Sequence, residues 1–129
     1  MSQHTIVELH GDGISPELSE SVHTIADAIP TDLSFHPIDL SQPNREALGD
    51  ALYDEAVETM TSHGVAMKYP TATTDVSPNK VLRERCQFSV IHRPVCSIPG
   101  IETNFTQQLD IDVVRVATGE HGAIAAALN

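Results

Sequence analysis

Arginines in the second half of the chain are the residues best suited to bind a small anion. Six of the seven basic residues fall between positions 68 and 115, and guanidinium groups match carboxylate and phosphate geometry. Arg93 and Arg115 lie in the apolar runs FSVIHRPV and DIDVVRVA, where an arginine needs an anionic partner. That partner is either a ligand or an internal acid, with Asp110, Asp112 and Glu120 as candidates. On charge alone, an ordinary solvated surface is favoured.

The stretch SPNKVLR adds hydrogen-bond donors to these charges. A loop entering a helix here places Ser77, Asn79 and free backbone N–H groups at the positive end of that helix, with Arg83 one turn further on. This grouping can hold a carboxylate. From these residues alone, however, a helix cap at Ser77 followed by an exposed Arg83 is the favoured interpretation.

Glycines after the first apolar run superficially suggest a phosphate-binding turn. Gly11 and Gly13 flank Asp12 just before a helix, where a backbone can approach a phosphate. Pro16 stands where the third glycine of a dinucleotide motif belongs. A tight turn is therefore favoured over a cofactor loop.

The spacing of the histidines and cysteines does not indicate a metal site or a disulfide. The seven histidines show no zinc-binding spacing, so none is assigned to a metal. Cys86 and Cys96 lack a paired-ligand spacing and are expected to be free thiols. Asp110 and Asp112 would share one face of a strand, but solvation at a strand end explains them.

Length and charge restrict the class of protein. The chain has 129 residues, 40% of them hydrophobic, and a net charge of -11, so one domain over residues 1–129 is expected. Such acidity repels nucleic acid and anionic lipid. Without an apolar stretch of membrane-spanning length or a signal-peptide pattern, a cytoplasmic protein is expected.

Alternating strand and helix patterns must position the candidate residues. Strands are expected at HTIVELH, LSFHPIDL, VAMKYP, FSVIHRPVCSI and DIDVVRVA. Helices are expected after Ser15 as N-cap, from about 44 to 63, and over VLRERC. Pro37 suggests an edge strand, and apolar residues recur at helical spacing in the first helix. The order indicates an α/β fold, a mostly parallel sheet flanked by helices. The tail HGAIAAALN is either a terminal helix or a partner-facing segment.

Six motifs in order resemble the isocitrate/isopropylmalate dehydrogenase family. They are GDGISPE from Gly11, KYPTAT from Lys68, Ser77-x-Asn79-x-x-x-Arg83, Arg93-Pro94, SIPG from Ser97, and DVVR from Asp112 followed by TGE. The resemblance runs from about position 4 to about position 120. It covers roughly the N-terminal third of a usual family subunit.

The resemblance implies a 2-hydroxy acid site. In it, Ser77, Asn79, Arg83, Arg93 and Arg115 hold the carboxylates of a small di- or tricarboxylate, and no residue is assigned a catalytic role. Thr73 would lie near NAD or NADP, whose binding is expected to be weak or absent. Guanidinium groups would orient the substrate for hydride transfer.

The same resemblance implies what the chain lacks. The family's catalytic lysine and metal-binding aspartates come from a region after the end of this sequence. Binding without turnover is therefore the leading hypothesis, and uncovered strand edges suggest a homo-oligomer. The alternatives are an active dehydrogenase completed by another chain, and a protein-interaction module derived from the family.

Overall fold

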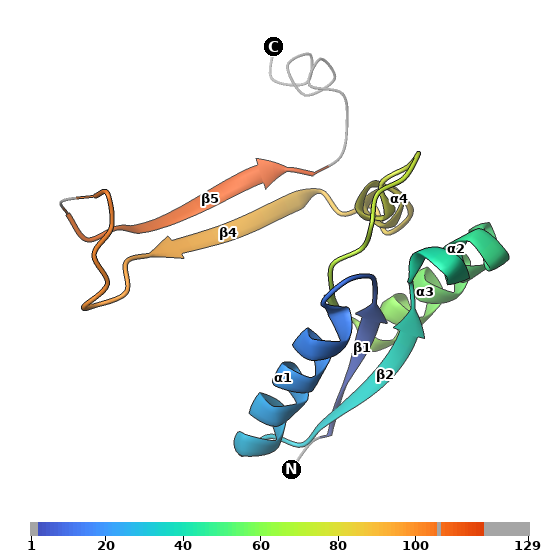
Figure 1. Ribbon diagram of the computed structural model, residues 1–129, viewed down its shortest axis with the longest axis horizontal. Coiled ribbons are helices and arrows are strands. Elements are labelled where there is room, and N and C mark those ends of the chain that lie inside the picture. Colours follow the sequence, from blue (N-terminus) through green and yellow to red (C-terminus); the bar gives the residue numbers. More distant parts are fainter. Residues whose placement is uncertain (1–2, 106, 118–129) are drawn as a thin grey trace. The chain divides into compact units, whose positions relative to one another are not determined.

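The computed structural model describes residues 3–105 and 107–117. These residues divide into two compact units, one ending at Cys86 and one beginning at Gln87, and each is described by itself (Figure 1). The prediction of one domain over residues 1–129 stays a prediction. The tail HGAIAAALN and Glu120 lie outside the described residues.

The first unit is built on a three-stranded parallel sheet in the order β2-β1-β3. Its strands are β1 (His4–His10), β2 (Leu33–Asp39) and β3 (Ala66–Lys68). In the middle of the sheet, three consecutive β1 residues are buried, because helices pack against this strand. The α/β prediction is thus confirmed, as is the edge position of the Pro37 strand.

Helices of the first unit close a small aliphatic core. They are α1 (Ser15–Ala28), α2 (Gln42–Leu48), α3 (Asp50–His63) and α4 (Pro78–Arg85). The single helix expected from 44 to 63 is two helices, because Gly49 at φ 54° breaks it, in a left-handed region that favours glycine. The buried core comprises Val7, Leu9, Ile38, Leu40, Leu52, Tyr53, Ala56, Met60 and Leu82.

The first helix differs from the sequence prediction at its start. Ser15 is its first residue, not its N-cap, and the Ser15 Oγ accepts a hydrogen bond from the Gly11 N–H at 2.8 Å. The apolar stripe of this helix is largely solvent-facing, since Ile25 is 63% exposed whereas Ser15 and Ser19 are buried. The helix instead directs its serine side chains toward β1, where the Ser19 hydroxyl donates a hydrogen bond to the buried Glu8 carboxylate.

The second unit contains a β-hairpin. Strands β4 (Val90–Cys96) and β5 (Asp110–Val116) pair antiparallel along seven residues each. They form a two-stranded sheet of their own, so they do not extend the parallel sheet. Every β4 and β5 side chain is exposed except the partly buried Ile91. Of all the helices described in both units, none is long and apolar enough to cross a membrane.

Candidate functional site

The start of α4 carries the predicted donors in the first unit. Ser77 is the N-cap residue, as predicted, and Pro78 follows in the first turn, although the Ser77 side chain makes no capping hydrogen bond. Asn79 and Thr73 are exposed, whereas Ser77 and Arg83 are partly buried. The capping interpretation and the donor interpretation therefore both remain compatible with this segment.

The hairpin places Arg93 and Arg115 on one face. The strand register sets Arg93 opposite Val113 and Arg115 opposite Ile91. Side chains directly opposite share a face and alternate along each strand. The two arginines are therefore diagonal neighbours, with side-chain origins about 7–8 Å apart. The hairpin brings these two predicted residues together.

The other face of the same hairpin carries its acids. Asp112 Oδ1 lies 2.7 Å from His92 Nε2, and Asp110 Oδ1 accepts a hydrogen bond from Cys96 Sγ at 3.3 Å. This bond is the first cause of the raised pKa of the exposed Cys96 thiol. The alternation directs these acids away from the arginine face. Asp110 and Asp112 are therefore not the internal partners that the sequence left open.

Two arginines form ion pairs within the first unit, whereas the three predicted to bind a ligand form none among the described residues. Arg45 pairs with Asp12, and Arg85 pairs with Asp50 and Asp54. Within residues 3–105 and 107–117, no carboxylate forms an ion pair with Arg83, Arg93 or Arg115. These three are the arginines to which the family resemblance assigned a ligand.

The glycine turn after β1 is filled by the chain itself. A Cβ on Gly11 would lie 2.0 Å from the Pro70 carbonyl oxygen, and the Asp12 N–H donates to that oxygen at 2.7 Å. The backbone is thus packed against the segment after β3 instead of being open to a phosphate. The tight-turn prediction is confirmed, and this turn does not fit a dinucleotide pyrophosphate.

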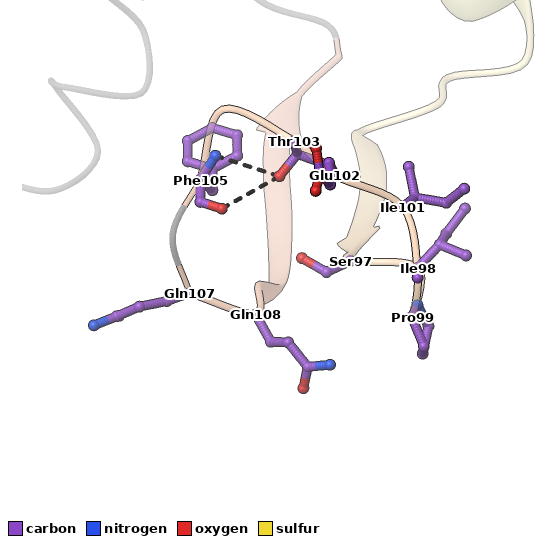
Figure 2. A pocket seen from close by; sticks show the side chains of 10 residues that line it. Ser97, Ile98, Pro99, Ile101, Glu102, Thr103, Phe105, Gln107 and Gln108 are labelled. Carbon is purple, nitrogen blue, oxygen red and sulfur yellow. Dashed lines mark hydrogen bonds between the residues drawn. The ribbon is translucent and has the colours of Figure 1, made fainter.

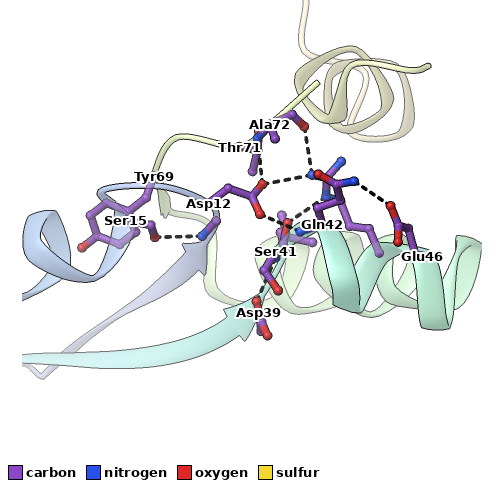
Figure 3. A network of polar contacts seen from close by, with 12 residues as sticks. Asp12, Ser15, Asp39, Ser41, Gln42, Glu46, Tyr69, Thr71 and Ala72 are labelled. Atoms are coloured by element: carbon purple, nitrogen blue, oxygen red, sulfur yellow. Dashed lines mark hydrogen bonds and ion pairs between the residues drawn. The ribbon is translucent and has the colours of Figure 1, made fainter. Parts of the chain in front are cut away.

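Asp12 joins three segments through one carboxylate. It accepts hydrogen bonds from the Gln42 and Ala72 N–H groups, each at 2.7 Å, and pairs with Arg45 at 3.0 Å (Figure 3). Arg45 also donates to the Ala72 carbonyl. Burial opposes ionisation, but these backbone donors and the guanidinium outweigh it and lower the pKa of Asp12. The carboxylate stays charged and holds the turn.

Glu8 is a second structural carboxylate, and it is only 1% exposed. Its Oε1 accepts hydrogen bonds from the Tyr69 hydroxyl at 2.5 Å and the Ser19 hydroxyl at 3.0 Å. Its Oε2 lies 3.1 Å from both His10 Nε2 and His23 Nε2. One acid of β1 thereby connects the sheet to α1 and to the residue after β3.

The titration of this cluster follows from its contacts. Burial raises the pKa of Glu8, but the Tyr69 and Ser19 hydrogen bonds and the two histidines outweigh it, so that the net pKa is lowered. Burial and the hydrogen bond to Glu8 raise the pKa of Tyr69 to about 12. Over the described residues, no group of three or more His, Cys, Asp or Glu side chains is arranged to hold a metal ion. The contacts of Glu8 link β1 to Ser19 and His23 of α1 and to Tyr69.

Sequence reasoning missed both carboxylate networks. The contacts of Glu8 join positions 15 and 61 residues away, which no local pattern reveals. Arg45 offered a signal, because it is the single base among twelve acids in residues 1–64. A lone cation in an acidic segment is a natural partner for a buried or half-buried acid.

Two surface hollows do not suit a carboxylate. One, of about 620 Å³ beside α1, is lined by Glu20, Asp27 and Asp39 together with His10 and His23. The other, of about 310 Å³, is formed by the loop between β4 and β5, with apolar and amide side chains around it (Figure 2). Neither is lined by a lysine or arginine.

The chain has an α/β fold, which it shares with part of larger solved structures. No protein-family model matches the chain. It superposes on the TT0538 protein from Thermus thermophilus with a TM-score of 0.75 and 25% identity, over 87% of this chain and 24% of that one. An isocitrate dehydrogenase from Methylococcus capsulatus gives a TM-score of 0.75 at 23% identity, over 88% and 34% of the two chains.

The sequence of the chain is similar to those of mitochondrial isocitrate dehydrogenase subunits. The chain is 32% identical over 127 residues to subunit 2 of the mitochondrial NAD isocitrate dehydrogenase of Saccharomyces cerevisiae, covering 95% of this chain and 34% of that subunit. Identity to the alpha subunit of Rattus norvegicus is 28%, with 92% and 32% covered. The chain therefore belongs to the isocitrate/isopropylmalate dehydrogenase family. It spans about a third of the length of these curated relatives.

Proposed function

We propose that this chain binds a small di- or tricarboxylate through Arg83, Arg93 and Arg115, with Ser77 and Asn79 as hydrogen-bond donors. The observation that carries the proposal is the hairpin face on which Arg93 and Arg115 stand together without an acid from the hairpin. Two adjacent guanidinium groups favour a ligand with more than one carboxylate, since each can bind in a bidentate manner.

The family relationship supports the choice of ligand. The curated relatives named above are isocitrate dehydrogenase subunits, and isocitrate is a tricarboxylate. The predicted ligand residues come from both compact units, so the proposal requires Arg83 to reach the same ligand as the hairpin pair. A double-mutant cycle tests this requirement, because residues that share one ligand show non-additive effects.

Calorimetric titration with isocitrate, isopropylmalate and tartrate is the direct test. Arg93→Ala should weaken binding at least tenfold, since losing a charge-assisted contact costs about 1.5–3 kcal/mol. Lys80→Ala is the matched control: it removes one positive charge from an exposed Lys80–Glu84 pair and should bind like the parent chain. No heat with any of the three acids, or equal affinities for both variants, would refute the proposal.

The cycle of Arg83→Ala and Arg93→Ala then addresses convergence. If both residues hold one ligand, the double variant should bind more tightly than the sum of the two single losses predicts. Strict additivity would remove Arg83 from the site while leaving the hairpin pair in place.

We also propose binding without turnover by this chain alone, with Thr73 as the contact for a weakly bound NAD or NADP. The closure of the β1–α1 turn by the Pro70 carbonyl supports this view, because that turn offers no room for a pyrophosphate. The purified chain should form no NAD(P)H from isocitrate with Mg²⁺. Production of NAD(P)H would favour the alternative, an active dehydrogenase.

The cytoplasm is the proposed compartment, and a homo-oligomer is the proposed assembly. Cys86 and Cys96 are both free thiols, which suits a reducing compartment. The exposed strands of the hairpin favour association with another chain. Fractionation and sedimentation of the native protein test these two points.

A further inference from the structure

The segment between β3 and α4 carries two of the predicted ligand residues, Thr73 and Ser77. Its residues 73–76 are exposed and belong to neither a helix nor a strand. Within the described ranges, the hydrogen bonds of residues 72–77 are made by the two end residues, Ala72 and Ser77. The position of this segment therefore depends on what holds its two ends.

Asp12 and Arg45 hold the Ala72 end. Asp12 Oδ2 accepts a hydrogen bond from the Ala72 N–H at 2.7 Å (Figure 3), and the Arg45 guanidinium donates to the Ala72 carbonyl at 2.9 Å. The two side chains also pair with each other at 3.0 Å. The Arg45 side chain is only 8% exposed, and its Nε donates to the Leu40 carbonyl at 2.8 Å. Both backbone polar groups of Ala72 are thus bound to side chains that are themselves held in place.

Helix α4 holds the other end of the segment. The Ser77 carbonyl accepts the Lys80 N–H at 2.9 Å, and Leu82 of the same helix is buried in the core of the first unit. The Ser77 hydroxyl makes no capping hydrogen bond, so the helix does not use it. Residues 73–76 are therefore a short connection between two fixed ends, and fixing both ends limits their conformations.

We propose that Asp12 and Arg45 position Thr73 and Ser77 for their ligands by holding Ala72. The inference rests on the proposed function, in which Ser77 donates to a carboxylate and Thr73 contacts NAD or NADP. Asp12 and Arg45 are then positioning residues, which act through Ala72 and not through the ligand. A segment released at Ala72 would have to be ordered on binding, and the lost entropy would weaken binding.

Two matched substitutions test the role of Asp12. Asp12→Asn keeps the backbone hydrogen bond from the Asp12 N–H to the Pro70 carbonyl, but it turns one of the two accepting oxygens into a donor. Glu8→Gln makes the same chemical change in the other carboxylate network, alters the net charge equally and leaves Ala72 bound. Circular dichroism of both variants establishes that they fold. If Asp12→Asn does not, Arg45→Lys takes its place, because it keeps the charge but loses the fork that reaches both Asp12 and Ala72.

Backbone ¹⁵N relaxation of the full chain without ligand gives the first readout. In the parent chain, the order parameters of residues 73–76 should lie near the rigid value of about 0.85, and in Asp12→Asn they should fall below about 0.6. Glu8→Gln should keep the parent values. Low order parameters for residues 73–76 in the parent chain, or equal values in the two variants, would overturn the proposal.

Calorimetric titration with isocitrate gives the second readout. Asp12→Asn should weaken binding about fivefold or more, whereas Glu8→Gln should bind like the parent chain. On a Ser77→Ala background, Asp12→Asn should cause no further loss, because both changes remove the same contact. A purely structural role of Asp12 would give equal losses on both backgrounds and would overturn the proposal.

The two readouts separate this inference from the proposed function. No heat from the parent chain with isocitrate, isopropylmalate or tartrate would refute the proposed function, and the order parameters alone would then decide whether Asp12 fixes the segment. If Asp12→Asn loosens residues 73–76 without weakening isocitrate binding, the positioning role is wrong and the proposed ligand stands.

Discussion

The two compact units use their carboxylates in opposite ways. In the first unit, Glu8 is 1% exposed and contacts four side chains from α1, β1 and the segment after β3. In the hairpin, the Asp112 side chain is 68% exposed and contacts His92 alone. A buried acid must be fully partnered, whereas an exposed one is compensated by water. The same chemical group is therefore structural in one unit and dispensable in the other.

Apolar side chains show the same contrast. The buried hydrophobic residues run from Val7 to Leu82, and along the described part of the second unit none is buried. In the hairpin, Val114 is 67% exposed and Ile111 is 51% exposed. The first unit can thus be expected to hold its own fold. The second unit leaves the apolar side chains of its two strands exposed or partly buried.

The largest effect in the first unit is expected at Gly11. Gly11→Ala brings a Cβ to 2.0 Å from the Pro70 carbonyl oxygen, and backbone cannot yield as a flexible side chain can. Overpacking of this kind should lower the free energy of unfolding by about 3 kcal/mol. This loss can be measured by urea unfolding, monitored through the near-ultraviolet signal of tyrosine. Both tyrosines, Tyr53 and Tyr69, lie in this unit.

Gly13→Ala is the control for that substitution. Gly13 has φ +63°, but nothing lies within 4 Å of its Cβ position. Its cost is limited to the left-handed backbone, about 1 kcal/mol. Equal losses for the two alanines would mean that Pro70 does not pack on the turn.

A smaller loss is expected for Glu8→Gln. It removes a charge that accepts two hydroxyl hydrogen bonds and faces two histidines, and it should cost about 2 kcal/mol near neutral pH. The pKa of Glu8 is lowered from its ordinary 4.5 on folding. Its contribution is therefore present above about pH 4.5 and lost as the pH falls through the folded value.

Unfolding midpoints measured from neutral to acidic pH test this sign. The parent chain should lose stability on acidification, and Glu8→Gln should show a flatter profile. Some slope should remain, because the pKa of Asp12 is also lowered. Identical profiles would show that Glu8 is not the charged centre of the cluster.

Local sequence patterns predicted the helices and strands better than they predicted the tertiary contacts. The parallel strands, Ser77 at the start of α4 and the glycine end of α3 at Gly64 each follow from residues within one turn or strand. The orientation of α1 could not be predicted in this way. The buried Glu8 requires hydroxyl and imidazole partners from that helix, and Ser19 and His23 supply them.

In the candidate site, too, local patterns predicted the strands but not how their side chains are arranged. Arg93 and Arg115 were placed in strands from their apolar neighbours, and the strand register adds that they share a face. The sequence left Asp110 and Asp112 open as their partners. Alternation along β5 alone puts these acids on the face opposite Arg115. Only the pairing of β4 with β5 shows that Arg93 shares the face of Arg115, because a shift of one residue would reverse it.

The smallest effect is expected at the exposed carboxylate of the hairpin. Asp112→Asn makes the same chemical change as Glu8→Gln, but both partners of the His92–Asp112 pair are more than half exposed. Such a pair contributes at most about 0.5 kcal/mol. Amide hydrogen exchange along β4 and β5 should therefore change by no more than about twofold. A tenfold loss of protection would show that Asp112 stabilises the hairpin about as much as Glu8 stabilises the first unit. The contrast between the two units would then fail.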